Sequence, residues 1–235
     1  MRLREGATGN PFADLRVRQA IALAIDRERL VMEQMAGEAL VAPLPVSSFV
    51  FGFDPRVPAP GRDLEAARRL LAQTPYRAGF EADLDQRDMT GFYGNMVAAQ
   101  LAPLGIGLSV RTLGETDFFE RVSKRPSMYL LRFSCRIGDA QEFLDKWAHS
   151  RDDARGLGGS NYSYQISPLP GLDEEIEGAR RELEPAARRL KLQAALRRIS
   201  EAALLIPLLN GKTWRWCRRA WSGSRGRTAS GTSPS

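Results

Sequence analysis

The chain has 235 residues, of which 43% are hydrophobic and 26% are charged, an ordinary balance for a globular protein. No run of eighteen apolar residues occurs, so we expect no membrane span. The first ten residues lack the apolar stretch of a secretory signal peptide.

The formal net charge of +6 is concentrated at the C-terminal end. Residues 211–235 contain no acidic residue and six basic ones, Lys212, Arg215, Arg218, Arg219, Arg225 and Arg227. The other 28 basic residues are balanced by 28 acidic ones, so residues 1–210 carry no net formal charge. A nucleic-acid-binding domain concentrates positive charge on a folded face, and we therefore expect no nucleic-acid partner. The segment 211–235 is predicted to be a disordered, low-complexity basic tail.

The segment from Asp14 to Met35 predicts one amphipathic helix, with Asp14 as its N-cap and Gly37 as its stop. Its apolar residues recur every three or four positions. The proline-rich segment 41–62 follows, and it predicts an extended connector whose aromatic and aliphatic residues are buried. Asp63 then caps a short helix that runs to Leu71.

The middle of the chain alternates strands and helices. Strands are predicted at 79–85, 105–113 and 127–135, and helices at 91–103 and 115–124. This order, with short connections, favours a parallel sheet, and ligands of such sheets lie beyond the carboxyl ends of the strands. For the third strand, that end is Phe133 to Asp139.

After this unit come a short helix with buried aromatic residues, a polar loop, two further helices and an apolar strand. The predicted ranges are 140–150 for the short helix, 171–183 and 185–203 for the two helices, and 204–212 for the strand. The fold class is therefore α/β, a βαβαβ-containing lobe with additional C-terminal helices.

No catalytic constellation is evident. The chain has no nucleophile-elbow, P-loop or dinucleotide-binding motif. The glycine-rich loop 156–161 is interpreted as a surface turn, and Asp152 and Asp153 as a loop neutralised by neighbouring arginines. His149 has no metal-ligand partner at a suitable spacing, so no metal or other cofactor is expected. Cys135 and Cys217 are interpreted as free thiols, and one disulfide between them is the alternative.

Several phrases resemble the family 5 solute-binding proteins, which are extracytoplasmic receptors of ABC importers for peptides, nickel chelates and related solutes. The matching phrases, in chain order, are NPFADLRVRQAIALAIDRERLV (10–31), GFDP (52–55), DLEAARRLLAQ (63–73), AAQLAPLGIGLSVRTL (98–113), GDAQEFLDKWAHSRD (138–152) and IPLLNGKTW (206–214). Each phrase alone is weak, but together and in this order they are specific. In the family the first phrase opens the second lobe of a two-lobed protein.

The resemblance implies a periplasmic-binding-protein-like fold of type II, of which residues 1–210 form an incomplete second lobe. It implies a receptor that is not an enzyme, that encloses a small solute between two lobes, and that delivers it to an ABC permease. It also implies a periplasmic location, whereas the chain as given, without a signal peptide, is expected to be cytoplasmic. A sensor domain of a regulator on the same fold, with a basic tail for nucleic acid, is the alternative hypothesis.

The resemblance also implies candidate ligand-binding residues. After the third strand, peptide-binding members carry an aromatic residue, two further residues and then an aspartate. This aspartate pairs with the amino terminus of the peptide. Counting back from Phe143 and Leu144 places the aromatic at Phe133 and puts Arg136 where the aspartate would be. The candidates are Phe133, Ser134, Arg136 and Asp139.

An arginine at that position reverses the charge. An ammonium about 4 Å from a guanidinium is repelled by about 4 kcal/mol at an effective dielectric constant of about 20. Three alternatives follow: Asp139 replaces the missing carboxylate, the solute is anionic or neutral, or Arg136 points to solvent.

Overall fold

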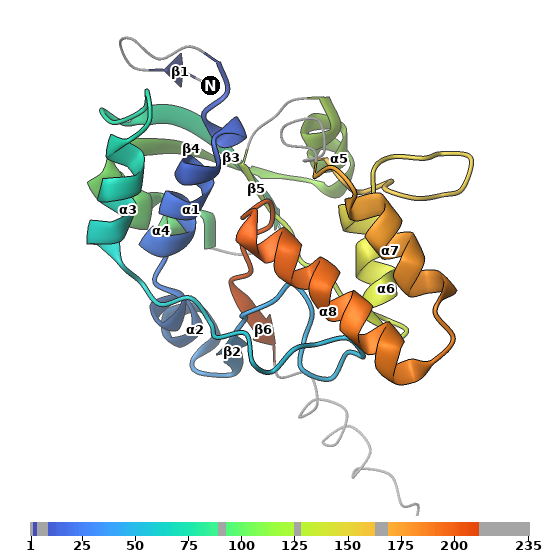
Figure 1. Ribbon diagram of the computed structural model, residues 1–235. Helices are drawn as coiled ribbons and strands as arrows, with labels where there is room; N and C mark the ends of the chain where they lie inside the picture. The colour runs from blue at the N-terminus through green and yellow to red at the C-terminus, as the bar shows by residue number, and fades with distance from the viewer. Residues whose placement is uncertain (1, 4–8, 89–92, 125–127, 163–168, 212–235) are drawn as a thin grey trace, which may run out of the picture.

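The computed structural model describes residues 2–3, 9–88, 93–124, 128–162 and 169–211 (Figure 1). The helices within these residues are η1 (Pro11–Ala13), α1 (Leu15–Ala24), α2 (Arg27–Met35), α3 (Leu64–Ala72), α4 (Tyr93–Leu101), η3 (Ala102–Leu104), α5 (Glu115–Lys124), α6 (Ala140–Phe143), η4 (Leu144–Ala148), α7 (Leu172–Arg181) and α8 (Pro185–Glu201). The strands are β1 (Arg2–Leu3), β2 (Ala39–Val41), β3 (Phe80–Arg87), β4 (Ile106–Leu113), β5 (Met128–Leu130) and β6 (Leu209–Gly211). The predicted α/β class is confirmed.

The central strand of the main sheet is β3. It pairs in parallel with β4 along its whole length, and its second half pairs in parallel with β5 on the other side. On the same side as β5, β1 pairs antiparallel with the start of β3. The parallel order β4–β3–β5 matches the predicted βαβαβ unit.

One face of this sheet is apolar and carries the first core. Alternate residues of β3 point toward α1, α3 and α4, which gather on one side of the sheet in Figure 1. The buried side chains include Val17, Ile21, Ala67, Leu71, Phe80, Ala82, Leu84, Val97, Leu101 and Ile106. The period of two in the strand and the three-to-four spacing in the helices account for this packing.

A second core lies under α6, α7 and α8, on the other side of the molecule in Figure 1. It is built from Leu44, Val46, Val50, Phe143, Leu144, Leu172, Ile176, Ala179, Leu192, Ala195, Leu196 and Ile199. Its first members, Leu44, Val46 and Val50, belong to the connector 41–62, so the predicted burial of aliphatic residues of this connector is confirmed. Phe51 fixes the connector, because its N–H donates to the carbonyl of Gly138 and its carbonyl accepts from Ala140 N.

The first predicted helix is two helices, so the expectation of one continuous helix is wrong. Ile25 is extended, and the side chain of Asp26 accepts a hydrogen bond from Arg29 N. This carboxylate caps a new helix, and the backbone of Asp26 leaves the helical region to make the cap. The chain turns here while Ile21, Ala24 and Ile25 all stay buried.

The last two strands are shorter than predicted. The third strand of the sheet ends at Leu130, and Cys135, expected on that strand, lies beyond it. The C-terminal strand β6 occupies only Leu209–Gly211, where it pairs antiparallel with β2. The tail after Gly211 lies outside the described residues, as does Cys217.

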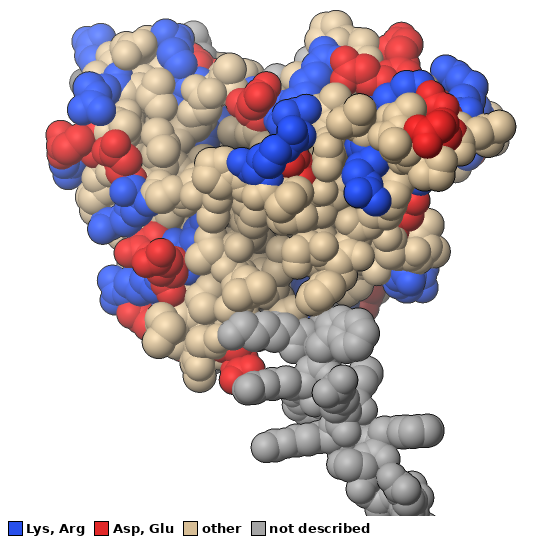
Figure 2. Space-filling view, turned by 60° about the horizontal axis from the view of Figure 1, so that its bottom comes forward, with Lys and Arg blue, Asp and Glu red and all other residues tan. Residues whose placement is uncertain are grey.

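Charged side chains of both signs are interspersed around the margin of the face in Figure 2, and the middle of that face is uncharged. This face therefore presents no continuous basic patch of the kind that nucleic acid requires. Within the described residues, no helix is both long and apolar enough to cross a membrane.

Candidate functional site

The parallel strands β3, β4 and β5 end at one edge of the sheet, at Arg87, Leu113 and Leu130. From β5 the chain continues as a stretch without regular secondary structure to Cys135, bends at residues 136–138 and enters α6. All four predicted ligand residues lie between the end of β5 and the start of α6. We call residues 131–136 the edge segment, and Asp139 lies just after it.

The edge segment alternates between exposed and partly buried residues. Arg132, Ser134 and Arg136 are exposed, whereas Phe133 and Cys135 pack against the second core. The ring of Phe133 lies edge-on to Phe143, with centroids 5.4 Å apart, and it also contacts Trp147. The side chains of Ser134 and Arg136 are therefore available to a ligand, and Phe133 supports them from behind.

Cys135 anchors the segment through a weak bond. Its Sγ donates to the carbonyl oxygen of Asp139 at 3.1 Å, and burial raises the pKa of the thiol. A thiol with a raised pKa holds its proton at neutral pH and is a poor nucleophile. Cys135 is a free cysteine.

Asp139 is engaged within the lobe. Its Oδ1 accepts from Gln141 N at 2.8 Å and so caps α6. Its two oxygens also accept from Nη1 and Nη2 of Arg188 on α8, at 2.6 and 3.1 Å. This fork geometry is the strong form of an arginine–carboxylate pair, and it joins α6 to α8.

Glu142 holds the bend at residues 136–138. Its Oε2 accepts from the backbone N–H groups of Arg136, at 2.8 Å, and Ile137, at 3.2 Å. Its Oε1 accepts from Nζ of Lys146 at 3.2 Å. Burial alone would raise the pKa of Glu142, but the hydrogen bonds from Ile137, Lys146 and Arg136 together hold it below its usual value.

The side chain of Arg136 leaves the bend and is 81% exposed. Its Nε lies 3.9 Å from Oε1 of Glu142, beyond hydrogen-bond distance. The backbone of Arg136 is thus fixed while its guanidinium faces outward.

The second face of the sheet carries an ionic network that the sequence interpretation missed. Arg111 of β4 donates through both Nη atoms to Asp83, each at 2.7 Å. Arg121 of α5 donates to Asp85 at 2.9 Å and to Asp83 at 3.0 Å. The side chain of Asp85 is fully buried. The alternation of Asp83 and Asp85 with apolar residues in β3 was the available signal.

His149 is the C-cap of η4, and its side chain reaches α7. Its ring is buried, and Nδ1 lies 2.7 Å from the carbonyl oxygen of Ser150. Nε2 lies 3.3 Å from Oε1 of Glu177 on α7. Glu177 is also bonded by Arg155 and Arg181, and these partners, Arg155 first and His149 next, lower the pKa of Glu177 to about 2.

The loop 150–161 is a structural turn. Asp152 bonds Arg155 and Asp153 bonds Arg151, which confirms the expected local neutralisation. Gly158 has φ +63°, and a Cβ there would lie 2.4 Å from the carbonyl oxygen of Ser150. This glycine thus allows a close backbone approach, as a turn requires.

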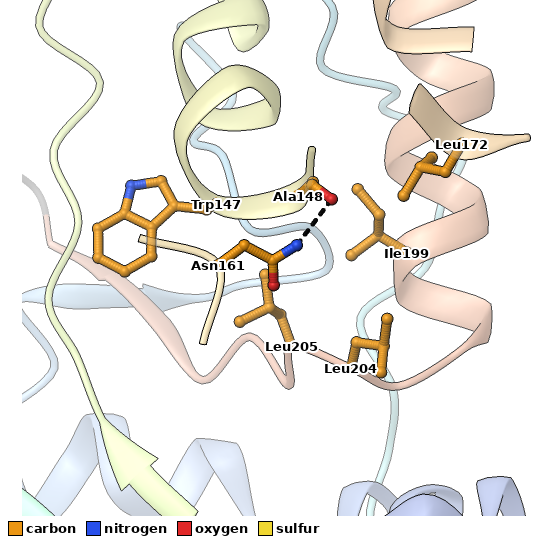
Figure 3. A pocket seen from close by; sticks show the side chains of 7 residues that line it. All are labelled: Trp147, Ala148, Asn161, Leu172, Ile199, Leu204 and Leu205. Carbon is orange, nitrogen blue, oxygen red and sulfur yellow. Dashed lines mark hydrogen bonds between the residues drawn. The ribbon is translucent and has the colours of Figure 1, made fainter. Parts of the chain in front are cut away.

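A small pocket with room for about one water molecule lies between this loop and α8 (Figure 3). It is lined by Trp147, Ala148, Asn161, Leu172, Ile199, Leu204 and Leu205. The amide nitrogen of Asn161 donates to the carbonyls of Ala148 and His149, so the lining offers a ligand mostly apolar surface. Within the residues that the structure describes, no group of three or more His, Cys, Asp or Glu side chains could hold a metal ion.

Solved structures share this fold. The chain matches the periplasmic binding protein DppA from Helicobacter pylori in complex with the peptide STSA, with a TM-score of 0.78 and 21% identity, over 89% of this chain and 40% of that one. It matches MoaA from A. tumefacien R10 in complex with mannopinic acid, with a TM-score of 0.74 and 24% identity, over 89% of this chain and 42% of that one.

NikA from Staphylococcus aureus in complex with Ni(L-His)2 matches with a TM-score of 0.73 and 16% identity, over 86% of this chain and 43% of that one. The chain therefore spans about two fifths of the length of these relatives. No curated protein matches the chain.

The sequence profile of the bacterial extracellular solute-binding proteins, family 5 (middle region), matches residues 2–155, which is more than half of the chain. That match agrees with the fold and covers the first five of the six phrases. Members of this family are extracellular solute-binding proteins, and the Helicobacter pylori relative is a periplasmic binding protein associated with an ABC transporter. The chain belongs to family 5 of the bacterial extracellular solute-binding proteins.

Proposed function

We propose that residues 1–210 form one lobe of the solute receptor of an ABC importer. The observation that carries the proposal is the family match together with the coverage: nearly the whole chain superposes on about two fifths of each relative. The relatives hold a peptide, mannopinic acid and a nickel–histidine complex. A small solute of comparable size is the ligand that we propose here.

We place the solute at the carboxyl edge of β3, β4 and β5. Ser134 and Arg136 would face the solute, and Phe133 and Asp139 would hold the edge segment in position. Small-molecule sites bury most of the surface of the ligand, whereas the edge segment presents only one wall. Enclosure thus needs a second lobe that closes against this edge, as in hinge-closing receptors.

In this proposal the closed, two-lobed receptor works outside the cytoplasm and presents its solute to the permease of the importer. The chain performs no chemistry on the solute.

The first test is the DNA upstream of Met1, read for an in-frame first lobe and export signal. The encoded first lobe is then co-expressed with this chain, and thermal unfolding is measured with a panel of peptides, sugar acids and metal chelates. A solute at 100 times its Kd stabilises a binding protein by about 2.7 kcal/mol, and we expect stabilisation of this size only for the two-lobed assembly. The chain alone presents one wall of the site and should bind the same solute only weakly, at the high ligand concentrations that an NMR titration can reach.

Two outcomes would contradict the proposal. One is a solute that stabilises the chain alone as much as the assembly, because a single lobe would then suffice. The other is an assembly that no member of the panel stabilises.

A further inference from the structure

We infer that the edge segment selects a solute that carries a carboxylate, and that Arg136 determines this specificity. The inference rests on the proposed function, which places the solute at this edge. It goes further by naming the charge of the group that is bound there.

The first step is that Arg136 is available. Its guanidinium is 81% exposed, and the nearest carboxylate with which it is paired, Glu142, lies at 3.9 Å. Glu142 already accepts from two backbone N–H groups and from Lys146. The charge of Glu142 is therefore used to fix the bend, and the five donors of Arg136 remain for an incoming acceptor.

The second step removes the alternative that Asp139 supplies a negative charge to the solute. Both of its oxygens are held by the guanidinium of Arg188, and one of them also caps α6. A solute ammonium at Asp139 would have to displace this fork. The hydrogen bond to Asp139 also raises the pKa of Arg188, so the pair stays ionised.

The third step concerns the side chains that precede Arg136 along the edge segment. Arg132 and Ser134 are exposed at the two alternate positions before it. Residues two apart on an extended chain lie about 7 Å from each other on one side. The side that faces outward therefore carries two cations and a hydroxyl donor, and the edge segment contains no acidic residue.

The fourth step is that this wall is held in place before the solute arrives. Phe133 and Cys135 fix its inner side, and Glu142 fixes the backbone at Arg136. Residues 132–135 form no backbone hydrogen bond with the rest of the described chain. Their N–H groups are thus additional donors for an anionic group, at little cost in ordering.

The test uses the full chain and three probes of matched size: N-acetylglycine, glycinamide and N-acetylglycinamide. These are an anion, a cation and a neutral molecule. Binding is followed by NMR through the backbone amides of residues 132–136 and the Nε–H signal of Arg136. We expect saturable shifts with N-acetylglycine, and an affinity for glycinamide that is at least tenfold weaker.

Arg136→Gln should weaken the binding of N-acetylglycine about tenfold. Arg136→Asp should reverse the preference, so that glycinamide binds more tightly than N-acetylglycine. The matched control is Arg77→Asp, because Arg77 is exposed at the opposite edge of the sheet, before β3 begins. Arg77→Asp changes the net charge by the same amount as Arg136→Asp, and it should leave the affinity for N-acetylglycine unchanged.

Three results would overturn the inference. They are equal or tighter binding of glycinamide by the unmodified chain, no loss on Arg136→Gln, and an equal loss in Arg77→Asp, which would indicate non-specific attraction by net charge. If glycinamide is preferred, the site stands and its charge class is wrong. If no probe shifts residues 132–136, the placement of the site in the proposed function fails as well.

Discussion

The guanidinium of Arg27 lies buried at the start of α2 and donates through Nε to the carbonyl oxygen of Pro207 at 2.9 Å, across 180 positions of the chain. Its Nη1 donates to the carbonyls of Ala22, Ile25 and Pro60. Burial lowers the pKa of Arg27 to about 10, so it remains charged at neutral pH. One side chain thus joins the first helices, the connector and the returning C-terminal segment.

We expect Arg27→Met to lower the free energy of unfolding by about 3 kcal/mol, because it leaves buried carbonyls without donors. Urea denaturation measures the change. The matched control is Arg29→Met on the same helix, where the side chain is exposed and pairs with Glu33. Such surface pairs contribute about 0–1 kcal/mol, so an equal loss in both variants would refute the role of Arg27.

The ionic network on the second face of the sheet supports another prediction. Arg121→Met should destabilise the chain by about 3–5 kcal/mol, since it leaves the fully buried carboxylate of Asp85 without this partner. Adding Asp85→Asn should recover part of the loss, because a neutral amide needs no cation. A double-mutant cycle in urea measures the coupling, and strictly additive losses would contradict it.

Much of the fold follows from local patterns in the sequence. The alternation in β3, the caps at Asp14 and Asp63 and the proline at the first turn of α8 each act within a few residues. Such signals are visible without tertiary contacts. The break at Ile25 is also local, and Asp26 was its signal, but the continuous apolar face suggested one helix.

The parts that could not be predicted depend on distant partners. The end of β5 depends on where β3 stops offering hydrogen bonds, and the hydrophobicity of residues 131–135 carries no information about that. The pairing of Asp139 with Arg188 joins residues 49 positions apart. The placement of the candidate site at the carboxyl edge was predictable from strand order, whereas the engagement of Asp139 and the availability of Arg136 were not.

The turn at Gly158 supports a prediction with a close control. Gly158→Ala should lower the free energy of unfolding by about 1–3 kcal/mol, because φ is +63° and the new Cβ would meet the carbonyls of His149 and Ser150. Gly159→Ala, at the next position, meets nothing within 4 Å and should change stability by less than about 0.5 kcal/mol. Thermal unfolding of the two variants measures the difference, and similar losses would mean that the loop adapts.

The pairing of Glu177 with Arg155, His149 and Arg181 predicts sensitivity to acid. The pKa of Glu177 is about 2 in the folded chain, compared with 4.5 ordinarily. A carboxyl group whose pKa is lowered on folding binds fewer protons in the folded state, so its stabilisation is complete above about pH 5 and is lost as the pH falls toward 2. Glu177→Gln should therefore unfold at a lower temperature than the unmodified chain at pH 6, and the two unfolding temperatures should converge near pH 2.

The control is Glu65→Gln, which removes an exposed partner of Arg68. Its unfolding temperature should follow that of the unmodified chain from pH 6 to pH 2. If the difference in unfolding temperature between Glu177→Gln and the unmodified chain stayed constant from pH 6 to pH 2, Glu177 would act through packing and not through its charge.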